Sequence, residues 1–214
     1  MLGRRIGWVL GLALWGLPVL AWADIEVGLG YQYQQLEYSP VGGLEASSGL
    51  HGLTLRFREP IDEWYGDLKL FYLTGSADDV VSASGDETDW AAEYRFGRSL
   101  NHWFSLYTGV AYRDWTTEDG GFERERTYIY SPVGLGVGHP MGGMGSWRLG
   151  LEYGLLWESD IEPGTDDDGD YWQLEFEFQW TFAGRNTVFA APYVRQWSDT
   201  GDTTTFGLAL GMVF

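Results

Sequence analysis

The sequence predicts an all-β fold, a transmembrane antiparallel up-and-down β-barrel, and three observations lead to it. First, ten segments of the chain alternate between large apolar side chains and small or polar ones. Second, long polar connections alternate with short ones between these segments. Third, the chain of 214 residues has a formal net charge of −18 and yet contains 12 Trp, 13 Tyr and 11 Phe. A soluble domain this acidic rarely carries so many aromatic residues, whereas a barrel with aromatic girdles does.

The N-terminal residues 1–23 are predicted to be a cleaved signal peptide. Two arginines precede an apolar run over residues 6–20, and Ala-Trp-Ala then places small residues just before Asp24. A single membrane anchor is the alternative, but the short run and Pro18 favour cleavage. We therefore expect the barrel to occupy residues 24–214, where no apolar stretch approaches the ~18 residues of a spanning helix.

The alternating segments lie at residues 24–38, 50–59, 64–74, 88–98, 102–116, 127–138, 147–158, 171–182, 187–197 and 203–214. In the first five, one face carries Ile25, Val27, Leu29 and Tyr31, then Leu53, Leu55 and Phe57, then Leu68, Leu70 and Tyr72, then Trp90, Tyr94 and Phe96, then Phe104, Leu106, Val110 and Tyr112. The sixth, seventh, eighth and tenth segments continue with Ile129, Val133, Leu135 and Val137, then Leu149, Leu151, Tyr153 and Leu155, then Trp172, Leu174, Phe176 and Phe178, then Phe206, Leu208, Leu210 and Met212. This period of two is that of a β-strand. The ninth segment is the least regular, because Pro192 removes a ladder donor and indicates a bulge.

The lengths of the connections predict which strand ends lie on the same side of the membrane. Those after the first, third, fifth and seventh segments are long and acidic, whereas those after the second, fourth and eighth are only a few residues. The Gly-rich stretch 140–146 is the longest of the short set. Long loops on one side and short turns on the other, with an even strand number, are typical of membrane barrels. We predict ten strands, with eight as the second choice.

The apolar face is predicted to point outward. About ten strands enclose a narrow interior, which could not hold roughly five large side chains from every strand. The opposite face is rich in glycine and carries isolated charges. A closed barrel also leaves no unpaired strand edge in a lipid medium without water. A soluble barrel with the apolar face inside is the alternative.

The final segment, TTTFGLALGMVF, resembles the closing strand of a bacterial outer-membrane β-barrel. In that class the insertion machinery reads a terminal aromatic residue, so the resemblance implies that Phe214 is an assembly signal. Further stretches resemble small outer-membrane barrel proteins without a settled activity, in the OmpA-type, porin-like superfamily: YTGVAYRDW at 107–115, RTYIYSPVGLGV at 126–137, WRLGLEYGLLW at 147–157 and APYVRQW at 191–197. The resemblance implies the outer membrane of a Gram-negative bacterium, with barrel-assembly machinery, membrane lipid and lipopolysaccharide as partners.

Charged residues on the inward face form the main candidate site. They are Glu26, Arg56, Arg58, Asp67, Lys69, Glu93, Arg95, Arg113, Arg148, Glu152, Glu175, Glu177 and Arg195. Both signs occur in similar number, which predicts a lumen filled by paired charges, each carboxylate bound to a guanidinium fork. A pore that sorts solutes by charge is the alternative.

A second candidate lies at the outer end of the lumen. Two strands end alike, with an arginine and then a tryptophan two residues later, and two tyrosines enter from the sixth strand. The cluster comprises Arg113, Trp115, Tyr128, Tyr130, Arg195 and Trp197. It could hold a small anionic or ring-shaped ligand, or simply close the barrel as a packed rim.

The remaining chemistry is limited. The acidic balance excludes nucleic acid as a partner, and the absence of cysteine excludes disulfides and thiolate metal sites. Residues 166–170 (DDDGD) carry the oxygens that Ca²⁺ prefers but lack the spacing of a calcium loop, so we predict neither a bound metal nor a cofactor. His51, with Ser47 and Ser48 nearby, suggests a lipid-modifying enzyme, but no motif of such enzymes accompanies it. We predict a non-enzymatic surface or envelope-integrity barrel, with a narrow porin-like channel as the alternative.

Overall fold

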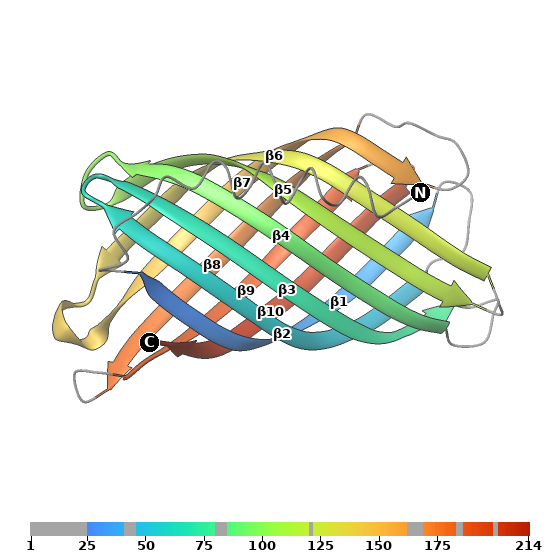
Figure 1. Ribbon diagram of the computed structural model, residues 1–214, viewed down its shortest axis with the longest axis horizontal. Helices are drawn as coiled ribbons and strands as arrows, with labels where there is room; N and C mark the ends of the chain where they lie inside the picture. The colour runs from blue at the N-terminus through green and yellow to red at the C-terminus, as the bar shows by residue number, and fades with distance from the viewer. Residues whose placement is uncertain are drawn as a thin grey trace.

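The computed structural model describes residues 25–40, 46–79, 85–119, 122–161, 169–182, 186–198 and 201–214. Ten strands form a closed antiparallel barrel in which every strand pairs with its sequence neighbours and β1 pairs with β10 (Figure 1). The strands are β1 (Glu26–Pro40), β2 (Ala46–Ile61), β3 (Trp64–Asp79), β4 (Gly85–Ser99), β5 (Phe104–Asp119), β6 (Phe122–Pro140), β7 (Gly145–Ile161), β8 (Asp170–Phe182), β9 (Asn186–Ser198) and β10 (Gly201–Val213). The prediction of ten strands is confirmed, and the second choice of eight is wrong. The predicted signal peptide lies outside the described residues.

The barrel closes where the two ends of the chain meet. The β1–β10 ladder runs from the pair Gly28 and Val213 to the pair Pro40 and Gly201. Beyond the ladder, the Phe214 amide donates to the Val27 carbonyl at 2.9 Å. In Figure 1 the C-terminus lies at the same end of the barrel as the turns β2–β3, β4–β5 and β6–β7. We call this the periplasmic end and the opposite one the outer end. No helix in the described part of the chain is long and apolar enough to cross a membrane.

The strands are longer than the sequence predicted. They contain 13 to 19 residues, whereas a tilted strand crosses a bilayer with ~9–11. Polar residues predicted to form long outer loops instead continue the ladders, so that only residues 120–121 separate β5 from β6. The prediction of long connections is therefore wrong at this hairpin. The reason is that alternation fades where neither face is lipid-exposed, although backbone pairing continues.

The outer surface carries the large apolar side chains. Near the periplasmic end the exposed aromatic residues include Trp64, Phe96, Trp103, Trp180 and Phe182. Roughly eight residues further along the strands, about one membrane crossing away, lie Tyr33, Tyr72, Tyr153, Trp172 and Phe206. Exposed aliphatic residues occupy the band between these two belts, including Leu53, Leu55, Leu106, Val133, Leu151 and Leu210. This is the apolar band and double aromatic girdle of a membrane-spanning barrel.

Inside, tyrosine rings lie over glycines of the neighbouring strand. The four cross-strand pairs are Tyr65 with Gly97, Tyr107 with Gly134, Tyr171 with Gly154, and Tyr193 with Gly207. A Cβ added to Gly134 would lie 2.1 Å from Tyr107 Cζ, so only glycine permits this approach. The rings thus lie along the barrel wall and fill the lumen without blocking the strands' curvature.

Two prolines interrupt the ladders. Around Pro132 the β5–β6 pairing passes from Thr108–Val133 directly to Ala111–Tyr130. The Ser131 hydroxyl donates to the Gly109 carbonyl at 2.9 Å, which replaces part of the lost ladder. Around Pro192, β8–β9 pairing likewise stops between the pairs at Glu175 and Phe178, while the β9–β10 ladder continues. The predicted irregularity at Pro192 is therefore confined to one side of β9.

Candidate functional site

The predicted lumen charges lie on the inner face of the barrel. Asp67, Glu93, Arg95, Arg113, Glu152, Glu177 and Arg195 are buried, while Arg56, Arg58, Lys69, Arg148 and Glu175 are partly buried. Glu26 is exposed at the periplasmic rim. Period-two alternation brings all of them inward, because each lies on the face of its strand opposite the large lipid-facing side chains.

Glu93 of β4 is the centre of the middle level. Its carboxylate accepts hydrogen bonds from Arg195 Nη2 at 2.8 Å, from the Tyr130 hydroxyl at 2.8 Å and from Arg95 Nη2 at 3.1 Å. Arg195 also donates from Nε to Gln173 Oε1. Three donors around one carboxylate satisfy its oxygens, as burial of a charged group requires.

Glu152 of β7 extends this level across the barrel. Arg95 Nε lies 2.9 Å from one Glu152 oxygen, and the Tyr171 hydroxyl donates to the other at 2.5 Å. Arg95 therefore bridges Glu93 and Glu152, two carboxylates from strands that are not neighbours. The chain of groups from β9 through β4 to β7 crosses the lumen completely.

A second ion pair lies nearer the outer end. Arg113 binds Asp89 through both Nε at 2.9 Å and Nη2 at 2.7 Å, and both side chains are almost fully buried. Gln34 Nε2 donates to the same carboxylate, and Gln34 Oε1 accepts from the Tyr193 hydroxyl at 2.9 Å. The paired charges are thus held by neutral groups from β1 and β9 as well.

Apolar and aromatic side chains fill the outer half of the lumen. One cluster, which we call the aliphatic plug, comprises Leu36, Leu50, Phe71, Leu73, Ala91 and Trp115. The other, the aromatic plug, comprises Ala111, Tyr128, Tyr130, Tyr171 and Trp197. Within it, the rings of Tyr128 and Trp197 stack at 5.1 Å, and the Arg113 guanidinium lies 5.2 Å from the Trp197 ring. The predicted outer cluster is therefore assembled but buried, so it does not present an open ligand site.

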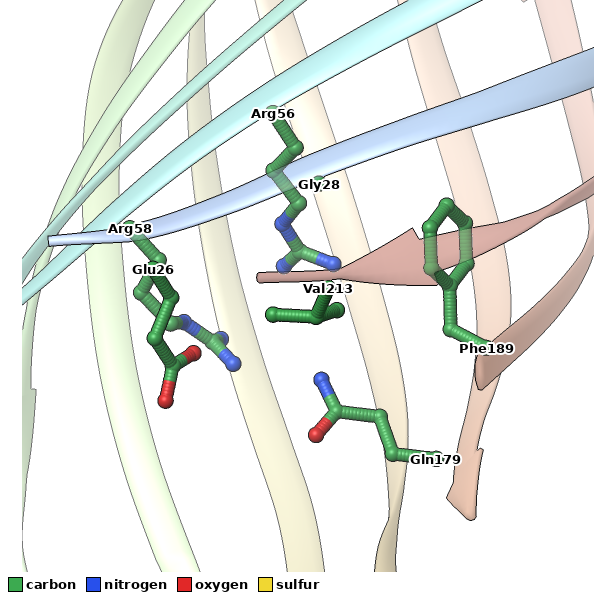
Figure 2. A pocket seen from close by; sticks show the side chains of 7 residues that line it. All are labelled: Glu26, Gly28, Arg56, Arg58, Gln179, Phe189 and Val213. Atoms are coloured by element: carbon green, nitrogen blue, oxygen red, sulfur yellow. The ribbon is translucent and has the colours of Figure 1, made fainter. Parts of the chain in front are cut away.

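Charged side chains line the periplasmic half of the lumen. Arg56 forms ion pairs with Asp67 of the neighbouring strand and with Glu177 across the lumen, and Gln179 Nε2 donates to Glu177 at 2.8 Å. Lys69 lies 3.9 Å from Glu175. Two small recesses lie between these groups, each with room for about one water molecule. Figure 2 shows the one at the rim, lined by Glu26, Gly28, Arg56, Arg58, Gln179, Phe189 and Val213.

Several lumen residues were missed by the sequence analysis. Asp89 and Glu87 point inward, and Glu87 accepts a hydrogen bond from Trp115 Nε1. Leu36 and Leu50 of the aliphatic plug were also missed. Each is an even number of residues away from the inward-facing residues of its strand. Extending the alternation toward the outer end of each strand would therefore have found them.

The suggested serine–histidine pair does not form. His51 is on the outer face of β2, where its ring lies 6.1 Å from that of Tyr31, whereas Ser48 is buried on the inner face. Ser47 shares the outer face with His51 but lies four residues along an extended strand, ~13 Å away. Of the DDDGD stretch, Asp166–Asp168 lie outside the described residues. Among those described, no group of three or more His, Cys, Asp or Glu could hold a metal ion.

The closed barrel, its apolar girdled exterior and its polar interior define the chain as an outer-membrane-type β-barrel. Comparison with solved structures agrees. The translocator domain of the autotransporter NalP from Neisseria meningitidis has a TM-score of 0.51 and 12% identity, covering 98% of this chain and 95% of that one. An outer-membrane channel from Pseudomonas putida F1 has a TM-score of 0.53 and 12% identity, covering 93% and 97%. The β-domain of the Bordetella autotransporter BrkA has a TM-score of 0.51 and 9% identity, covering 88% and 98%. At these identities the similarity is one of fold. No protein-family model matches the chain, and neither does any curated protein.

Proposed function

We propose that the protein is a non-enzymatic outer-membrane barrel whose lumen is closed to passive solute flow and which acts at the cell surface. The observation that carries this proposal is that described side chains occupy the middle level and the outer half of the lumen. Ion pairs cross it at the level of Glu93 and Glu152, and two side-chain plugs occupy its outer half. A solute would have to displace several buried, hydrogen-bonded groups at once, which costs several kcal/mol for each charge left unpaired.

The outer rim is the surface through which the protein would contact a partner at the cell surface. Glu37, Asp86, Glu118 and Asp202 are exposed on strand segments beyond the outer aromatic belt. Because these segments are paired strands, the carboxylates stand on a rigid rim. Such a rim suits a partner with basic groups. Lipopolysaccharide remains the proposed partner of the outer belt, and the barrel-assembly machinery that of Phe214.

Single-channel conductance in planar lipid bilayers tests the closed lumen. Wild-type protein should insert without resolved conductance steps. Trp197→Ala should produce steps, because it removes the ring that contacts three tyrosines of the aromatic plug. Trp172→Ala is the matched control, since it removes a lipid-facing tryptophan of the adjacent strand and should stay silent. Regular steps from the wild type, with an ion preference that follows the lumen charges, would refute the proposal.

A narrow gated channel is the second candidate, favoured by one observation. Two recesses between side chains lie in the periplasmic half, whereas in the described part of the chain two clusters of buried side chains occupy the outer half. One of the similar structures is a channel. In this case Trp197→Ala would only enlarge steps that the wild type already makes, so the same recordings separate the two functions.

A further inference from the structure

Glu87 of β4 is a buried carboxyl group without a cation bound to it. The residue is 2% exposed and points into the outer end of the lumen. Its Oε1 accepts a hydrogen bond from Trp115 Nε1, whereas Oε2 is buried and accepts none from the residues that the structure describes. Glu87 also forms no ion pair within that part of the chain. An ionised carboxylate in this position would lack the counter-charge that burial requires.

Two charged groups act on Glu87 from β4 and β5, and they bind each other. Asp89 lies two residues further along β4 on the same inward face, and Arg113 binds it through both Nε and Nη2. Glu87 comes three residues beyond Trp90, which pairs with Tyr72 of the outer aromatic belt, so it lies outside the membrane-spanning segment. Burial raises the pKa of Glu87 above its ordinary value of 4.5, and the Asp89 charge adds to this, while hydrogen bonds and Arg113 oppose it.

The other strands beside Glu87 supply no cation that binds it in the described part of the chain. Its cross-strand partner on β3 is Gly75, and β2 contributes the neutral Ser48 hydroxyl, which forms a hydrogen bond with the carboxyl group. Arg126 of β6 lies 4.8 Å from the Trp115 ring and forms no ion pair with Glu87. The site therefore suits a neutral carboxyl group better than a carboxylate.

Trp115 connects this carboxyl group to the closure of the lumen. It is a member of the aliphatic plug, and its indole nitrogen donates to Glu87. β4 begins at Gly85, so Glu87 lies close to the outer end of the barrel, from which water can reach it. An ionised Glu87 gains hydration only if water enters the plug or the side chain turns outward, and either change disturbs its bond to Trp115.

We propose that Glu87 is a pH-sensitive switch of the outer lumen. Protonated, it lets the aliphatic plug close. After its proton passes to the solvent, it draws water into the plug and releases Trp115. This inference rests on the proposed closure of the lumen and describes how that closure is regulated.

Labelling of a single thiol tests the switch, because the chain contains no cysteine. Ala91→Cys places a thiol in the aliphatic plug, where Ala91 is 1% exposed, and Ser198→Cys places a reference thiol at the exposed outer rim. Each refolded variant reacts with a charged methanethiosulfonate reagent at a series of pH values. The ratio of the two rates removes the pH dependence of the reagent and reports how often the plug opens to water.

In the wild-type background this ratio should rise between about pH 5 and 9, by up to about tenfold per pH unit, because one proton leaves for each opening. The sign follows from the raised pKa of Glu87, since the closed state is favoured below the ordinary value and loses that advantage as the pH rises through the raised one. In the Glu87→Gln background the ratio should stay low and flat, because an amide does not ionise. Glu63→Gln is the control: this periplasmic side chain is 64% exposed, and its loss of charge should leave the rise unchanged.

The outcomes separate the switch from the closure itself. Slow labelling of Ala91→Cys at every pH would overturn the switch and leave the closed lumen standing. Labelling as fast as at Ser198→Cys at every pH would overturn both. A rise that persists in Glu87→Gln would belong to another group and would also refute the assignment. Heat-modifiable migration on gels confirms folding, and Leu73→Cys, another position of the aliphatic plug, replaces Ala91→Cys if that variant does not fold. Failure of Glu87→Gln to fold would contradict the proposal, because a neutral side chain should be tolerated there.

Discussion

The buried pair of Asp89 and Arg113 offers a measurement of how dry the lumen is. Both carboxylate oxygens are bound, at 2.9 and 2.7 Å, and the side chains are 0% and 1% exposed. Arg113→Met keeps most of the side-chain volume but leaves Asp89 with Gln34 as its remaining donor. Breaking a buried pair in this way should lower the free energy of unfolding by about 3–5 kcal/mol.

The double variant separates the pair from its surroundings. Asp89→Leu with Arg113→Met replaces both charges by apolar groups of similar size, a change that is often neutral or stabilising. Only the Gln34 amide then loses an acceptor, at a cost of about 1–3 kcal/mol. We therefore expect the double variant to be more stable than Arg113→Met, with a coupling energy of at least about 2 kcal/mol.

Urea unfolding in lipid vesicles, under reversible conditions, gives the free energy of unfolding of the wild type, of Asp89→Leu, of Arg113→Met and of the double variant. The matched control is the exposed pair of Arg98 and Glu63, which has a comparable 2.6 Å contact but side chains 49% and 64% exposed. Its coupling should be about 0.2–1 kcal/mol. If the two cycles gave equal coupling, water would reach Asp89 as freely as it reaches the turn. The reasoning that the outer half of the lumen is sealed would then be wrong.

Three further predictions use the same unfolding assay or the assembly of the barrel in cells. Gly134→Ala should destabilise by about 1–3 kcal/mol because the added Cβ would overlap the tyrosine opposite, whereas Gly150→Ala, whose Cβ would meet its first neighbour at 3.6 Å, should change little. Leu151→Arg should cost about 2–4 kcal/mol at the lipid midplane. Glu152→Gln should cost less, and equal tolerance would mean that the faces are wrongly assigned. Deleting Phe214 should sharply lower the amount of heat-modifiable barrel while synthesis and export continue, and unchanged amounts would exclude its role as an assembly signal.

The number of strands and the face on which each side chain lies could be predicted, because both depend on one local property, the period-two alternation of the sequence. This property places Arg95 and Glu152 on the inner face without any knowledge of the partner strand. Their pairing could not be predicted, because β4 and β7 meet across the lumen only at a particular shear of the closed sheet. Leu36 was missed for a different reason. Its outer-face neighbours are polar where the strand leaves the lipid, so alternation fades although the backbone pairing continues.

The charged lumen also explains why one register of the barrel is preferred. In lipid, an apolar side chain is equally stable facing the bilayer or a packed interior, so an all-apolar chain would not distinguish its two faces. A slip by one residue exchanges the faces of a whole strand. In β4, such a slip would move Asp89, Glu93 and Arg95 outward, and a charge near the midplane costs about 2–4 kcal/mol for a basic residue and less for an acidic one. It would also leave Arg113, Arg195 and Glu152 without their partners, because these residues of other strands form ion pairs with those three side chains. The ion pairs thus penalise a wrong register on both sides of the barrel wall, even where their net contribution to stability is small.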